Sequence, residues 1–159
     1  MPHPHRARAL ASATLALACA LAACDAGTPE PDDLAPGTFR LEVSGRTYTG
    51  AATFHPYTEN VYRGASVHLV ASDSSVGMVV ESDELLNAGP GDRVLTLSYI
   101  QAPDGALYAN SRGAVLVTDT SGGGLAGRFE MRLSGTGPGP GRAPPVTVRG
   151  AFRARLASE

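Results

Sequence analysis

Hydrophobic and polar positions alternate with a period of two over most of the chain. Phe39, Leu41 and Val43, for example, each stand between polar or charged residues. Successive side chains of a β-strand point to opposite faces, so this alternation predicts a strand with one buried face. A turn at Gly45 and Arg46 separates it from a second alternating run, and the two runs together predict a β-hairpin.

The alternation continues to the end of the chain in short runs separated by Gly, Pro, Asn and Asp. A single helical turn is predicted at 82–87, with Ser82 as its cap, and no stretch keeps a 3.6-residue period. Eight short strands at this spacing predict an all-β fold, either an antiparallel β-sandwich or a small barrel. The predicted strands span 38–44, 47–54, 61–71, 76–81, 94–100, 113–119, 125–133 and 146–156.

The last two predicted strands form a hairpin whose register follows from their charges. A register with Glu130 opposite Arg149 avoids every direct Arg–Arg pair, which would be unfavourable on neighbouring strands. The Gly- and Pro-rich connection at 134–145 is long for a hairpin loop.

The amino-terminal segment follows a different pattern. Arg6 and Arg8 precede an apolar run at 9–20, which is too short to cross a bilayer as a helix. A positive region followed by a short apolar region is typical of a signal peptide, here predicted over residues 1–23.

The signal peptide ends in Leu21-Ala22-Ala23-Cys24, which resembles the lipobox of bacterial lipoproteins. The resemblance implies cleavage before Cys24, a diacylglyceride on its thiol, and a membrane-anchored lipoprotein of the bacterial cell envelope. An ordinary secreted protein cleaved at Ala-x-Ala is the alternative. Under the lipoprotein hypothesis Cys19 is discarded, so the mature chain has no internal disulfide.

Three prolines and four acidic residues occupy residues 25–37, with almost nothing to bury. This composition predicts an extended tether at 24–37, following the lipidated cysteine. The β domain is then expected to span residues 38–159.

The order of four segments in the second half of the chain resembles small β-rich bacterial lipoproteins of unknown function. The segments are GDRVL at 91–95, GAVLVT at 113–118, LAGRFEM at 125–131 and VTVRGAF at 146–152. The match covers somewhat less than half of the chain. It implies a tethered β domain and brings no catalytic or ligand-binding residue with it.

Charge and composition narrow the classes of function. All 13 basic residues are arginine, and with 15 acidic residues the formal net charge is −2. A negative chain without a platform of stacking aromatic residues does not predict a nucleic-acid partner. Neither a metal nor a cofactor motif is present, so no cofactor and no metal ligand are predicted.

Catalytic chemistry is weakly represented. Ser66 and His68 share one strand face, about 7 Å apart along the strand. They lack the Gly-x-Ser-x-Gly turn and an identifiable acidic partner, so two polar residues on a solvent face explain them better. No catalytic residue is therefore predicted. A hydrolase acting on an envelope or extracellular substrate is the alternative to a binding or structural protein.

The predicted ligand-binding residues are mainly arginines on the outward face of the last hairpin, opposite Phe129 and Phe152. Arginine binds phosphate, sulfate or carboxylate with two parallel hydrogen bonds, which would suit an anionic glycan or an envelope protein. The alternative is a solvated face whose charges are offset by acids of neighbouring strands. These arginines are Arg128, Arg132, Arg149, Arg153 and Arg155.

A second candidate surface is aromatic. The segment Phe54-His55-Pro56-Tyr57, together with Tyr62, is predicted to form an exposed loop. Tyr57 and Tyr62 could contact sugars or a partner there, and the alternative is a loop that packs its rings over the sheet edge.

Overall fold

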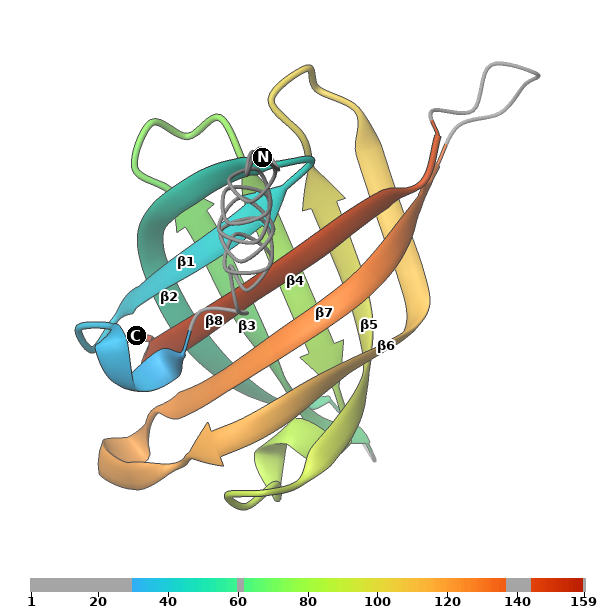
Figure 1. The fold of residues 1–159 in the computed structure, drawn as a ribbon. Helices are drawn as coiled ribbons and strands as arrows, with labels where there is room; N and C mark the ends of the chain where they lie inside the picture. The colour runs from blue at the N-terminus through green and yellow to red at the C-terminus, as the bar shows by residue number, and fades with distance from the viewer. Residues whose placement is uncertain (1–29, 60–61, 137–143, 159) are drawn as a thin grey trace, which may run out of the picture.

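The computed structural model describes residues 30–59, 62–136 and 144–158, which form eight antiparallel strands closed into a barrel (Figure 1). The predicted all-β class is thus confirmed, with the barrel in place of the sandwich. Each strand pairs with the next along the chain, and β8 pairs with β1 to close the barrel. The strands are β1 (Thr38–Val43), β2 (Arg46–Glu59), β3 (Tyr62–Ala71), β4 (Gly77–Ser82), β5 (Arg93–Gln101), β6 (Leu107–Asp119), β7 (Leu125–Gly135) and β8 (Val146–Leu156).

The predicted register of the last hairpin is confirmed. Glu130 of β7 lies opposite Arg149 of β8, and no arginine of β7 faces an arginine of β8. At the other side of β8, Glu42 of β1 lies opposite Arg149 as well. Arg149 therefore has a carboxylate on each flanking strand.

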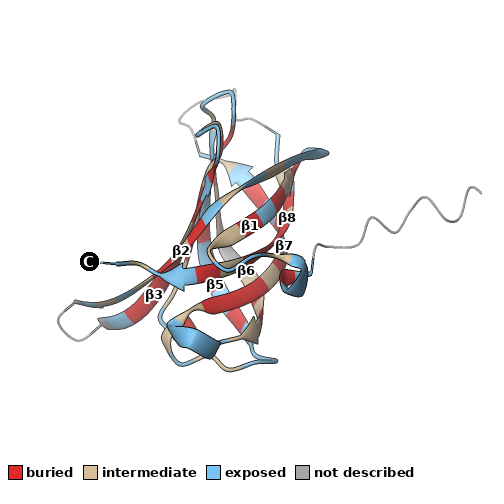
Figure 2. Cartoon of the chain, turned by 90° about the vertical axis from the view of Figure 1, so that its left-hand side faces the viewer, coloured by how far each residue is buried: buried red, intermediate tan, exposed pale blue. Residues whose placement is uncertain are grey.

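The interior of the barrel is filled with apolar side chains. Buried and more exposed positions alternate along the strands, as Figure 2 shows. An eight-stranded barrel is just wide enough for side chains to fill its interior. The largest fully buried side chains are Phe39, Phe152, Leu41, Leu69, Met78, Leu85, Ile100, Leu133, Val67, Val76, Val80 and Val115.

A short 3-10 helix, η2 (Glu84–Leu86), forms where the sequence predicts a helical turn. Asp83, and not the predicted Ser82, occupies the N-cap position, although the Glu84 N–H does donate a hydrogen bond to the Ser82 hydroxyl at 3.2 Å. Leu85 is buried, and η2 contacts β3, β4 and β5. The turn therefore adds an apolar side chain to the core beside these strands.

The second half of the predicted tether does not extend away from the domain. A 3-10 helix, η1 (Pro31–Asp33), contacts β7 and β8, and Pro31 is buried. Glu30 forms an ion pair with Arg128 of β7. Pro31 thus packs against the barrel wall and Glu30 is paired with an arginine, although proline and acidic residues also suit a solvated tether. Cys24 and the rest of residues 1–29 lie outside the described residues.

Among the described residues, no helix is both long enough and apolar enough to cross a bilayer.

Candidate functional site

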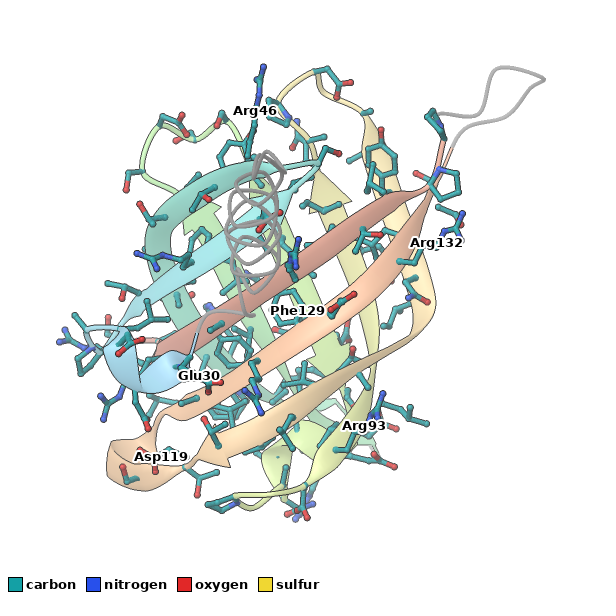
Figure 3. The ribbon with its side chains drawn as sticks, in the orientation of Figure 1. Glu30, Arg46, Arg93, Asp119, Phe129 and Arg132 are labelled. Carbon is teal, nitrogen blue, oxygen red and sulfur yellow. The ribbon has the colours of Figure 1, made fainter. Side chains whose placement is uncertain are left out.

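The five predicted arginines lie on the outer wall of β7 and β8, because residues of the other parity face the core. Phe129 and Phe152 are buried, whereas all five arginines are partly or fully exposed. Figure 3 shows Arg132 toward the opposite end of β7 from Glu30 and Asp119.

Three of these arginines have acidic partners. Arg128 pairs with Glu30, Arg149 with Glu42 of β1 at 3.1 Å, and Arg153 with Asp119 of β6 at 3.9 Å. Glu30 and Glu42 are far from the hairpin in sequence, whereas Asp119 ends the strand that precedes it. This outer wall is consequently mixed in charge, as the alternative interpretation of the arginine face expects. The structure gives Arg132 and Arg155 no ion pair with any described residue.

A groove of about 410 Å³ lies at the carboxyl end of β8, beside the turn between β6 and β7. Arg153 and Arg155 both line it, so the fold brings two of the five predicted arginines to one depression. The other lining residues are Pro36, Asp119, Ser121, Gly122, Gly124, Leu125, Ala126, Ala154 and Leu156.

Glycines shape the turn on one side of this groove, at η3 (Ser121–Gly123). Gly122 and Gly123 have φ values of +68° and +75°, which residues with a side chain rarely adopt. At Gly124 a Cβ atom would lie 2.4 Å from the carbonyl oxygen of Ala154, so only glycine lets the turn approach β8 this closely. The three consecutive glycines are therefore required by the conformation of the turn.

Asp119 is held against the same turn. Its Oδ1 accepts a hydrogen bond from the Ser121 N–H, and its Oδ2 accepts one from the Ser121 hydroxyl, both at 2.8 Å. These hydrogen bonds, the backbone one first, lower the pKa of Asp119 below its usual value, and Arg153 adds a smaller effect in the same direction. Asp119 therefore remains an anion at neutral pH and offsets part of the positive charge in the groove.

No protein-family model matches this chain, and neither a curated protein nor a solved structure matches it.

The predicted aromatic loop is instead a pair of strands. Phe54 to Tyr57 lie within β2 and pair with β3, and Phe54 is buried. The prediction of a loop was wrong, because β2 continues past Phe54 through Pro56 to Glu59. Pro56 lies past the residues of β2 that pair with β1 or β8, at an edge position where a missing N–H costs no ladder bond.

The two predicted tyrosines of this segment differ in what the structure describes. The Tyr57 hydroxyl donates a hydrogen bond to Glu81 Oε1 at 3.0 Å, which joins β2 to β4 across β3. Tyr62 is the first residue of β3, and its side chain lies outside what the structure describes. Tyr57 therefore lies in a polar cluster on the outer wall, made of Tyr57, Glu81, Ser66 and His68, and not in a loop.

Ser66 and His68 belong to this polar cluster, and their side chains meet. Ser66 Oγ lies 3.0 Å from His68 Nε2. Glu81 lies opposite Ser66 on β4 and accepts a hydrogen bond from the Tyr57 hydroxyl. It therefore does not serve as the acid that, in a catalytic triad, orients the histidine from the side of the ring away from the serine. Ser66 is only 8% exposed, which shields its hydroxyl from a substrate. These described residues do not assemble a Ser-His-acid triad.

The histidine ring of this cluster is held in a perturbed environment. Partial burial, followed by the neighbouring His55, lowers the pKa of His68 below its usual value, while Glu81 acts in the opposite direction. At neutral pH His68 is therefore mostly the uncharged imidazole.

Sequence reasoning missed a row of apolar side chains on the outer wall of β5. Leu95, Leu97 and Tyr99 are 64%, 37% and 44% exposed, whereas Thr96 and Ser98 between them are buried. The run at 94–100 has apolar residues on both faces of the strand, which indicates that some of them lie outward. The alternation alone does not say which face that is.

Proposed function

We propose that the protein is a lipid-anchored barrel of the bacterial cell envelope that acts by binding and not by catalysis. The lipobox-like segment ending at Cys24 supports the anchor. Glu30, which contacts the barrel wall, follows Cys24 by six residues. An extended chain spans at most about 3.6 Å per residue, so the lipid would hold the barrel within roughly 20 Å of the bilayer surface.

The filled interior supports binding on the outside. Fully buried Phe39, Leu41 and Phe152 occupy the space that a ligand would take inside a wider barrel. The groove at the carboxyl end of β8 instead offers a depression on the outer wall, with backbone and side-chain donors around it. A ligand is thus expected to bind at the wall.

The convergence of Arg153 and Arg155 on that groove is the observation that carries the proposal. Two guanidinium groups beside a glycine turn suit a phosphate, sulfate or carboxylate group. Asp119 opposes a highly charged polyanion, so a single anionic group within an otherwise neutral glycan fits better. We therefore propose an anionic envelope glycan as the ligand. The experiment below would point to a protein partner if no such glycan binds.

Replacing Cys24 with serine is expected to abolish lipidation and release the protein from the membrane. A cell that expresses the native chain should incorporate labelled palmitate into it and retain it in the membrane fraction. Cys19→Ser is the matched control and should remain labelled, because that cysteine would be removed with the signal peptide. Labelling of Cys24→Ser, or its retention in membranes, would contradict the anchor.

Replacing Arg155 with glutamate is expected to abolish stabilisation by an anionic glycan. At 100 times the dissociation constant, a ligand adds about 2.7 kcal/mol to the free energy of unfolding. For a domain of this size that raises the melting temperature by about 5–10 °C. The shift is measured on the full chain in detergent, with phosphorylated, sulfated and carboxylated glycans.

Arg93→Glu provides the matched control, because Arg93 is exposed, lies on β5 and does not line the groove. It should keep the full shift, and the same charge change at Arg155 should remove it. Equal loss in both variants would show a non-specific charge effect. If no anionic glycan shifts the parent at low salt, the groove is not a glycan site and crosslinking in cells should be used to find a protein partner.

A further inference from the structure

Two histidines from adjacent strands meet on the outer wall of the barrel. His55 of β2 lies opposite Ser66, and His68 of β3 lies opposite Thr53, so the histidines occupy diagonal positions of the ladder. Their ring centroids are 4.3 Å apart and the rings are tilted by 36°. Both side chains are partly exposed, so a solute can reach them.

Each ring is oriented by a hydroxyl group of its own strand. Thr53 Oγ1 lies 2.8 Å from His55 Nε2, and Ser66 Oγ lies 3.0 Å from His68 Nε2. In the described part of the chain neither Nδ1 atom takes part in a hydrogen bond. Histidines that bind metals commonly use one ring nitrogen for the metal while a hydrogen bond to the other fixes the ring, and the pair on this wall has that arrangement.

We propose that His55 and His68 bind one divalent first-row transition-metal ion through their Nδ1 atoms, with water as the remaining ligands. Imidazole nitrogen suits copper, nickel and zinc, and copper(II) should bind most tightly of the three. The described residues contain no group of three His, Cys, Asp or Glu side chains that could hold a metal ion. The site is therefore a two-imidazole site that exchanges its ion readily, and it is independent of the proposed glycan groove.

Neighbouring groups favour a cation here. Glu81 lies on β4 opposite Ser66, and its carboxylate offsets positive charge on this wall. The ion would be held between two strands and would crosslink the β2–β3 hairpin.

Copper(II), nickel(II) and zinc(II) should be titrated in detergent micelles into the unprocessed chain, which keeps residues 1–23 and carries Cys19→Ser and Cys24→Ser so that no thiol competes. The chain contains four histidines in all, at 3, 5, 55 and 68. We expect His55→Gln/His68→Gln to lose one equivalent of bound copper. His3→Gln/His5→Gln is the matched control and should keep that equivalent. Ser66→Ala should weaken the affinity about tenfold, because it frees the His68 ring.

A second measurement does not depend on any histidine variant. Copper(II) is paramagnetic, so substoichiometric copper should broaden the ring proton signals of His55 and His68 before those of other residues. Equal copper binding by the parent and His55→Gln/His68→Gln, or broadening confined to His3 and His5, would overturn the proposal. Unchanged circular dichroism of the double variant would show that its loss of copper is not a loss of fold.

Discussion

Replacing Phe152 with alanine is expected to lower the free energy of unfolding by about 3–5 kcal/mol. Its side chain is fully buried in the barrel, and its ring centroid lies 6.3 Å from that of Phe129. The loss combines the transfer free energy of the ring, its contact with Phe129 and the cavity left behind. A closed barrel has little freedom to collapse onto that cavity, because every strand is paired on both sides. Urea unfolding followed by circular dichroism measures the loss.

Tyr99→Ala is the matched control for this prediction. Tyr99 also carries an aromatic ring and lies on a strand that is paired on both sides, but it points outward and is 44% exposed. Its replacement should cost about 1 kcal/mol or less, since an exposed side chain loses little apolar contact. Similar losses at the two positions would show that the interior is not packed as the burial of Phe152 indicates.

Replacing Gly50 with alanine is expected to lower the free energy of unfolding by about 1–3 kcal/mol. A Cβ atom at Gly50 would lie 2.1 Å from the carbonyl oxygen of Val70, 2.8 Å from Ala71 Cα and 2.9 Å from Ser72 N. All three are backbone atoms, so no flexible side chain can move aside. Relief requires the end of β3 to shift away from β2, which strains the ladder between them.

Gly77→Ala on β4 is the control for the glycine substitution. A Cβ atom at Gly77 meets nothing within 4 Å, and its φ is not in the left-handed region. Alanine there should be neutral or stabilising by up to about 1 kcal/mol, because it restricts the unfolded chain. Thermal unfolding of both variants decides between the contact and a general effect of losing glycine. Equal destabilisation would contradict the steric argument for Gly50.

The proposed anchor and the proposed groove lie on the same part of the barrel. The segment that follows Cys24 contacts β7 and β8 through Glu30 and η1, and Pro36 of the same segment lines the groove. A lipid on Cys24 would therefore keep the groove near the membrane surface. The row of Leu95, Leu97 and Tyr99 lies on β5, which is far from β1 and β8 around the barrel.

The candidate sites were only partly predictable. The alternation around Phe129 and Phe152 was sufficient to place five arginines on the outer wall, because side-chain direction in a strand depends on parity alone. Their acidic partners could not be found this way. Glu30 reaches Arg128 through the folding of the η1 segment, Glu42 reaches Arg149 through the closure of the barrel, and Asp119 reaches Arg153 through the register of β6, β7 and β8.

By itself, the sequence determined the number and order of the strands, the helical turn at 82–87 and the register of the last hairpin, because these depend on local alternation, turn residues and pairing between neighbours. It did not determine that β2 continues to Glu59 or that β6 begins at Leu107. Only the tertiary structure decided which face of β5 is buried. There Thr96 and Ser98 point inward and are hydrogen-bonded to each other at 3.3 Å, while leucines point outward. It also decided the contact of His55 with His68 and the groove that the β6–β7 turn and Pro36 form beside Arg153 and Arg155. Such features depend on which strands become neighbours in space, and hydrophobic periodicity carries no information about that choice.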